Sequence, residues 1–245
     1  MTADAPGSAD LVVRRPGRSL AGSDWLLAGL SFSAGAYEAI AFLTFGKVFT
    51  AFQTGNLVFL GLGAAGTRPP AGPEPQTVLV SLVGFVVGCV VAVPLLRGAA
   101  PAGRRWPTRV VTTLALGLAV QVVFVLTWTT TSQPDERIGV LVALGALSMG
   151  LQMSAVRALD VAGVSTTAFT ATLALLAGRA GGQRQPAGMP LRLALVLVAV
   201  VLGALVGAEV IDDAHGVAPL APFAVELVVL VGAARRVTAG ADGHR

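Results

Sequence analysis

Six long apolar runs constrain the fold of this chain more than any other feature of its sequence. An α-helix rises about 1.5 Å per residue, so roughly 20 apolar residues cross a hydrocarbon core of about 30 Å. One such run fits a buried helix of a soluble protein, but six cannot all be buried inside one another in water. The chain is therefore predicted to be an integral membrane protein whose helices are surrounded by lipid.

The composition supports this prediction and excludes several other classes. Of the 245 residues, 54% are apolar and only 12% are charged, and the mean hydropathy is +0.77. The basic residues form short clusters between apolar runs instead of one patch, which argues against a nucleic-acid partner. Cys89 is the single cysteine, and the two histidines lie in a loop and a tail, so no metal site is expected. No enzyme motif and no cofactor-binding motif is present.

The apolar residues fall into eight segments, which predict an all-α bundle. The six that can span are Trp25–Phe45, Thr77–Leu96, Val110–Thr129, Ile138–Val156, Leu191–Ile211 and Ala218–Ala234. Two others, Val48–Ala65 and Gly163–Ala177, are shorter and rich in Thr with Gly or Ala. The first segment is read as an uncleaved helix, not a signal peptide. Residues 24–237 then form one membrane domain between cytoplasmic disordered tails, 1–23 and 238–245.

The two halves of the chain repeat one another. Val48, Thr50, Thr54, Leu57 and Leu60 align with residues 116 positions later, namely Val164, Thr166, Thr170, Leu173 and Leu176. Gly35 aligns with Gly150, and Gly88 with Gly203, at an offset of 115. Because the threonine matches and the offset are unlike chance matches among Leu and Val, a duplication is predicted, with repeats at about 24–129 and 137–236.

Arginine placement predicts the orientation of the repeats. The N-tail, the loop after the third segment, the loop after the sixth and the C-tail are Arg-rich, so all four are expected in the cytoplasm. The N-tail and the Arg97–Arg109 loop are separated by three segments, yet an even number of crossings must lie between them. One segment in each half therefore does not cross, and the short pair are the natural candidates. The halves become inverted repeats with broken, re-entrant segments, an arrangement that in transporters marks a midplane binding site. The competing arrangement has eight full spans and parallel halves.

Glu38 is the first candidate for the site, because a charged group in hydrocarbon costs at least about 2.5–3.5 kcal/mol. One hypothesis makes it a proton- or cation-coupling carboxylate that faces a cavity. The alternative is a structural acid, neutral or hydrogen-bonded to the broken segment. Glu226 is also intramembrane, and is expected to reach the interface from the outer third of the last span.

The broken segments supply the other candidates. In the first half these are Gln53, Thr54, Gly55 and Asn56, where Gly permits a bend and the polar side chains can satisfy freed backbone groups or face a ligand. In the second half they are Thr166, Thr167, Thr170 and Thr172, and Gln152 of the fifth span is the candidate partner of these threonines. The alternative interpretation is helix packing, with Thr and Asn bonded between helices.

Two stretches resemble the YoaK-like bacterial membrane proteins, a family grouped as a domain of unknown function. They are Gly35-Ala-Tyr-Glu38 with Val48-Phe-Thr-Ala-Phe-Gln-Thr-Gly-Asn-Leu57, and Gly150-Leu-Gln152 with the threonines that follow it. The sequence departs from that pattern at three positions: Glu38 replaces an Asp, Met153 an Asn, and Ala171 a Gly. The resemblance implies a multi-span topology and no agreed activity.

The sequence thus favours a transporter or channel for a small solute or ion in the inner membrane of a bacterium, with both termini cytoplasmic. The alternative is a non-transporting scaffold or a lipid-modifying membrane protein. The lipid bilayer is the expected partner, and a homo-oligomer is compatible with the sequence.

Overall fold

The computed structural model describes residues 21–67, 72–99, 106–130, 137–161, 169–185 and 188–238, and all regular structure within them is helical. The tails predicted at 1–23 and 238–245 lie almost entirely outside the described residues. Six helices are long: α1 (Ala21–Thr44), α3 (Pro75–Leu96), α4 (Thr108–Thr129), α5 (Ile138–Ala158), α7 (Met189–Asp213) and α8 (Leu220–Thr238). Two are short: α2 (Gln53–Ala64) and α6 (Phe169–Ala180).

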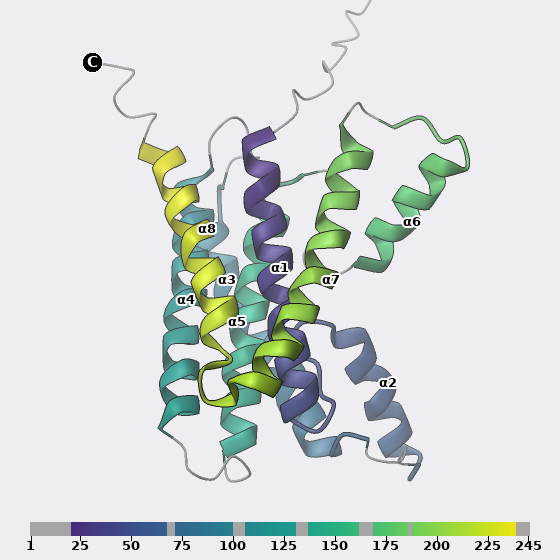
Figure 1. Cartoon of the computed structure of the whole chain (residues 1–245), viewed down its shortest axis with the longest axis vertical. Coiled ribbons are helices and arrows are strands. Elements are labelled where there is room, and N and C mark those ends of the chain that lie inside the picture. The colour runs from purple at the N-terminus through teal and green to yellow at the C-terminus, as the bar shows by residue number, and fades with distance from the viewer. Residues whose placement is uncertain are drawn as a thin grey trace, which may run out of the picture.

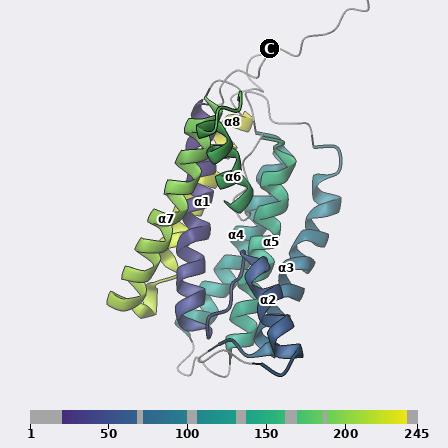
Figure 2. The ribbon, with the colours of Figure 1, turned by 90° about the vertical axis from the view of Figure 1, so that its right-hand side faces the viewer.

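The long helices run side by side along the long axis of the molecule (Figures 1 and 2). Within the described residues, six helical segments are long and apolar enough to cross a membrane. Large apolar side chains cover their outer faces, including Val90 on α3 and Val201 on α7, which are 61% and 65% exposed. The predicted all-α, six-span membrane bundle is confirmed.

The two short helices do not cross the bundle. Each has 12 residues and is therefore about 18 Å long, well short of a hydrocarbon core of about 30 Å. Both begin near mid-height, and α2 runs to one end of the bundle while α6 runs to the other (Figure 1). The short helices are the predicted broken segments.

A left-handed turn sends the chain from α1 back into the bundle. Gly46 and Lys47 have φ of 71° and 66°, and the Lys47 N–H donates to the Phe42 carbonyl at 3.1 Å. The glycine favours this conformation because it has no Cβ. Residues 48–52 then rise without helical structure to the start of α2, so α2 ends at the same end of the bundle where α1 ended (Figure 1).

Glycines bring two pairs of helices into close contact, α1 with α7 and α3 with α5. A Cβ at Gly35 would collide with the carbonyl of Val200, and one at Gly203 with the carbonyl of Phe32. In the other pair, Gly150 meets the carbonyl of Phe85 and Gly88 that of Leu147. Small residues allow such approach, which stabilises helix pairs in lipid.

These contacts recur at a constant spacing. Gly150, Phe85 and Leu147 each lie 115 positions from the residue that makes the equivalent contact, namely Gly35, Val200 and Phe32. Other helix contacts also correspond between the two halves. Helix α1 packs on α8 as α5 packs on α4, and α2 packs on α3 as α6 packs on α7.

The two ends of the bundle differ in charge. The start of α1 and α7 and the end of α3, α5, α6 and α8 share one end, uppermost in Figure 1. The arginines next to those helix ends include Arg97, Arg157, Arg179, Arg192 and Arg236. Asp212 and Asp213 are the last two residues of α7, at the opposite end. Asp24 and Arg192 tie α1 to α7 at the arginine-rich end, with 2.7 Å between Oδ1 and Nε.

Candidate functional site

The bundle interior is largely apolar, but a set of polar side chains is buried within it. Buried side chains include Glu38, Asn56, Gln121, Gln152 and Glu226, each at most 3% exposed. Among the buried residues that the structure describes there are two carboxyl groups and no lysine, arginine or histidine. Because buried charge is costly without a partner, these two carboxyl groups are the first places to look for a ligand or a proton.

Glu38 holds the unwound segment that precedes α2. Its Oε1 atom accepts hydrogen bonds from the Thr50 N–H at 2.8 Å, the Thr50 hydroxyl at 2.7 Å and the Ala51 N–H. Breaking a helix inside a membrane frees backbone groups that hydrocarbon cannot satisfy. One carboxyl oxygen of α1 therefore satisfies two of the freed N–H groups.

Asn56 satisfies the same segment from the other side. Its Oδ1 accepts from the Phe49 N–H at 3.1 Å, and its Nδ2 donates to the Phe49 carbonyl at 2.6 Å. Gln53 donates to the Thr50 carbonyl at 2.7 Å, and the Ser81 hydroxyl on α3 donates to the Phe49 carbonyl. The Asn56 side chain thus acts as a substitute for backbone pairing at the break.

Glu38, Gln53 and Asn56 therefore come together, and the two other candidates of this half do not join them. Thr54 is exposed on the outer face of α2. Gly55 is half-buried, and a Cβ there would meet the ring of Phe49 at 2.8 Å. Gly55 lets this ring pack against α2, a packing role in place of the predicted bend.

Two polar atoms near the break have no hydrogen-bond partner: Glu38 Oε2 and the Tyr37 hydroxyl. A Cβ at Gly145 on α5 would lie 3.2 Å from the Thr50 methyl and 3.4 Å from the Tyr37 oxygen. The absent side chain of Gly145 thus leaves room for Tyr37 and Thr50 beside the carboxyl group.

The starts of the two short helices meet at mid-height. The ring of Phe52, at the N-cap of α2, contacts that of Phe169, the first residue of α6, with centroids 5.5 Å apart. Helices that begin in the middle of a membrane direct N–H groups and the positive end of their dipoles at that point. Both views place these two starts together (Figures 1 and 2).

The second-half candidates are more dispersed. Gln152 is buried on α5 and donates from Nε2 to the Leu30 carbonyl of α1 at 3.2 Å, leaving its Oε1 without a partner. Leu30 precedes Glu38 by eight residues, so Gln152 lies about 12 Å along α1 from that carboxyl group. Thr172 is buried on α6 and Thr170 is exposed, while Thr166 and Thr167 lie outside the described residues.

A second polar cluster, which the sequence did not predict, lies halfway along the bundle. Gln121 on α4 donates from Nε2 to Glu226 Oε2 on α8 and, at 3.1 Å, to the Ser148 hydroxyl on α5. Ser33 on α1 donates to the Pro222 carbonyl at 3.1 Å and lies 3.5 Å from Glu226 Oε2. The expectation that Glu226 reaches the interface is wrong, since its side chain points into the bundle and is 1% exposed.

This central cluster, Ser33–Glu226–Gln121–Ser148, has its own internal correspondence. Ser148 lies 115 positions after Ser33 and donates to the Gly117 carbonyl at 3.3 Å, as Ser33 does to Pro222. Pro222 and Glu226 each follow their counterparts, Gly117 and Gln121, by 105 positions. A search for matched serines in the first and fifth spans could have found it.

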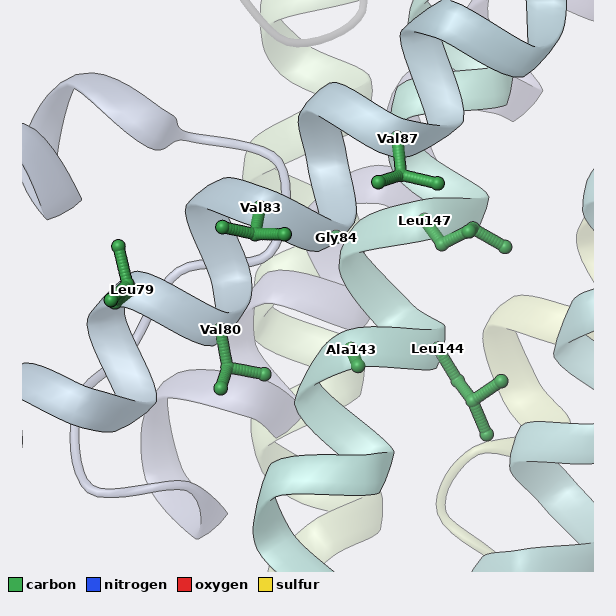
Figure 3. A pocket seen from close by; sticks show the side chains of 8 residues that line it. All are labelled: Leu79, Val80, Val83, Gly84, Val87, Ala143, Leu144 and Leu147. Carbon is green, nitrogen blue, oxygen red and sulfur yellow. The ribbon is translucent and has the colours of Figure 1, made fainter.

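Elsewhere in the described structure, one groove is apolar. A groove of about 460 Å³ between α3 and α5 is lined only by apolar residues, among them Leu79, Val83, Val87 and Leu147 (Figure 3). No group of three or more His, Cys, Asp or Glu side chains comes together in the described residues. Among the described residues, the polar oxygen atoms inside the bundle that could contact a ligand belong to amides, hydroxyls and two separate carboxyl groups.

Comparison with known proteins identifies the family to which the chain is similar. Residues 26–233 match the profile of the family described as "Protein of unknown function (DUF1275)". The chain is 36% identical over 155 residues to a "UPF0700 transmembrane protein YoaK" of Bacillus subtilis (strain 168). The alignment covers 62% of this chain and 64% of that relative, which is less than two thirds of its length. No solved structure matches the chain.

Proposed function

The chain belongs to the DUF1275 family of proteins of unknown function, and we propose that it moves a small solute or ion across the membrane through a site at mid-depth. The meeting of the α2 and α6 starts beside the buried carboxyl group of Glu38 carries this proposal. In transporters built from inverted repeats, half-helices that begin at the midplane form the binding site with unwound backbone.

The proposal includes an inverted duplication. It is supported by the glycine contacts that recur 115 positions apart and by the equivalent serine bonds of the central cluster. The opposite directions of the equivalent helices α1 and α5 also support it, because α1 runs down and α5 runs up in the view of Figure 1. Residues 24–237 would form one membrane domain in which each half contributes three spans and one half-helix.

In this proposal the protein lies in the inner membrane of a bacterium with its arginine-rich end in the cytoplasm. The positive-inside rule supports that orientation, since Arg97, Arg179, Arg192 and Arg236 all adjoin the end that holds the start of α1. The α2 side of the site would then face outward and the α6 side inward.

Glu38 is assigned two roles at the site. Its Oε1 stabilises the unwound segment, and its free Oε2 is available to a proton, a cation or a polar solute. Gln53 and Asn56 are assigned to holding the segment in shape, because their polar atoms bond to it.

One observation favours the alternative, a scaffold that transports nothing. Asn56, Gln53 and Ser81 satisfy one another and the segment, as they would in a static structure. A transporter needs that segment to rearrange, whereas a scaffold does not, and a flux measurement separates the two.

The test is flux into proteoliposomes that contain the purified protein. Stopped-flow light scattering would follow glycerol, urea and amino acids, and entrapped pyranine would follow proton entry with potassium clamped by valinomycin. We expect at least one of these fluxes to exceed that of protein-free vesicles, to fall at least tenfold in Glu38→Gln and to persist in Glu209→Gln. Glu209 is a matched control because it is an exposed acid at the end of a span. The transport proposal is overturned if no solute in this panel enters faster than in protein-free vesicles.

A further inference from the structure

The central cluster contains a carboxyl group and a primary amide that are hydrogen-bonded to each other. Gln121 Nε2 donates to Glu226 Oε2, and both side chains are 1% exposed. The other oxygen of each group, Glu226 Oε1 and Gln121 Oε1, has no hydrogen-bond partner. Two acceptors left unpaired on adjoining groups in a buried site are unfavourable unless something is shared between them.

Among the residues that the structure describes, no positive charge lies close enough to balance an ionised Glu226. From α1 it faces Ser33, and Tyr37 lies one turn further along that helix with Glu38 next to it. From α4 it faces Gln121. Helix α7 contributes acids, exposed Glu209 and the terminal Asp212 and Asp213, and Arg192 at its far end, which binds Asp24. On α8 itself, Arg235 and Arg236 lie nine and ten residues away, about 14 Å or more.

We propose that Glu226 and Gln121 form a proton-binding site at the centre of the bundle. The proton sits on Glu226 Oε1 and is donated to Gln121 Oε1, while Gln121 Nε2 donates to Glu226 Oε2. These two hydrogen bonds close an acid–amide ring that pairs every side-chain oxygen of both residues. One proton therefore neutralises the buried charge and satisfies two orphaned acceptors.

The same geometry disfavours a metal cation as the occupant. A bound Na⁺ or Ca²⁺ requires about six oxygen ligands, as hard cations do. Here an amide N–H already points at Glu226 Oε2 and another at the Ser148 hydroxyl, so donors occupy the space where further ligands would stand. The residues around the pair suit a hydrogen-bonded acid better than a coordination shell.

The depth of this site in the bundle would allow its proton to take part in a transport cycle. Ser33 and Ser148, which flank the pair, lie near the middle of α1 and α5, so the proton would reside at mid-depth. Tyr37, whose hydroxyl has no hydrogen-bond partner, lies one turn after Ser33 on α1 and directly before Glu38. The proton-binding proposal goes beyond the proposed transport and stands or falls without it, since it needs only the α4–α8 geometry.

Infrared spectroscopy of the full-length protein in nanodiscs at neutral pH tests the proposal. A protonated carboxyl group gives a C=O stretch that an ionised one lacks and that shifts in deuterium oxide. We expect Glu226→Gln to lose one such band and Glu209→Gln to keep it. In Gln121→Leu the band should move to higher frequency, because the acid C=O loses the amide N–H that donates to it.

A second measurement avoids replacing Glu226 in case that variant does not fold. In protein labelled with ¹³C at the glutamate side chain, solid-state NMR should resolve one carboxyl carbon at the protonated shift that moves in Gln121→Leu. The proposal is overturned if Glu226→Gln removes a carboxylate band and no acid band, or if no protonated carboxyl carbon responds to Gln121→Leu.

Discussion

The two buried carboxyl groups of this protein are held in different ways. Glu38, at the α1–α2 junction, accepts two backbone N–H groups and one hydroxyl from an unwound segment. Glu226, at the α4–α8 crossing, is bound by side chains of intact helices. Removing Glu38 therefore exposes broken backbone, whereas removing Glu226 changes the chemistry of the interior and leaves the helices paired. The first carboxyl group holds the unwound segment in shape, and the second is the proposed proton-binding group.

The largest expected effect on stability comes from Glu38→Leu. It leaves the Thr50 and Ala51 N–H groups buried without an acceptor, and each such group costs roughly 1–3 kcal/mol. We expect a loss of about 3–5 kcal/mol in the free energy of unfolding, measured by thermal or SDS unfolding in mild detergent. Glu38→Gln keeps one acceptor oxygen and should lose less than half of that. Equal losses in the two variants would contradict the assigned role of Oε1.

The next largest loss in the free energy of unfolding is expected for Asn56→Leu, at about 2–3 kcal/mol, because the Phe49 N–H then lacks its acceptor. The matched change in the other half is Thr172→Val, because Thr172 lies 116 positions after Asn56 and is also buried. It removes a single hydroxyl and should cost about 1 kcal/mol. The same unfolding assay compares them, and a reversed order would mean that the two half-helices are held by different means.

Gln121→Leu should cost about 1–2 kcal/mol, through loss of the bond to Glu226. The exchanged double variant, Gln121→Glu with Glu226→Gln, rebuilds the acid–amide pair with its members reversed. We expect it to recover most of the loss in the unfolding assay. No recovery would show that the pair depends on which helix carries the acid, contrary to a shared proton.

The smallest effect is expected for Thr54→Ala, within about 0.5 kcal/mol of the unchanged protein, as for most exposed substitutions. Thr54 is exposed on α2 while its neighbours Gln53 and Asn56 hold the segment. A clear loss of flux in this variant, with unfolding unchanged, would place the substrate path on the outer face of α2.

The sequence predicted the topology better than the site. Segment lengths and arginine parity were enough to find six spans and two short helices, because lipid and charge act on whole segments. Glu226 was misjudged because its depth in a span says nothing about which face of the helix it occupies. Its partners come from two other helices, α1 and α4, and the repeat offset falls from 115 to 105 in the last spans, where the connections differ in length. Thr54 shows the same limit, since a motif names neighbours in sequence but not the face that each presents.

We propose that α2 enters and leaves the membrane on one side and α6 on the other, which makes the two halves inverted, and cysteine labelling tests this most directly. Single cysteines at Ser8, Thr67, Ala99 and Gly181, in a Cys89→Ala background, would be labelled in intact cells with an impermeant thiol reagent. We expect Thr67 to be labelled from outside, and Ser8, Ala99 and Gly181 to be protected until the membrane is opened. Labelling of Ser8 and Thr67 on one side, or of Ala99 and Gly181 on opposite sides, would mean that a short helix crosses, and would contradict the inverted repeat.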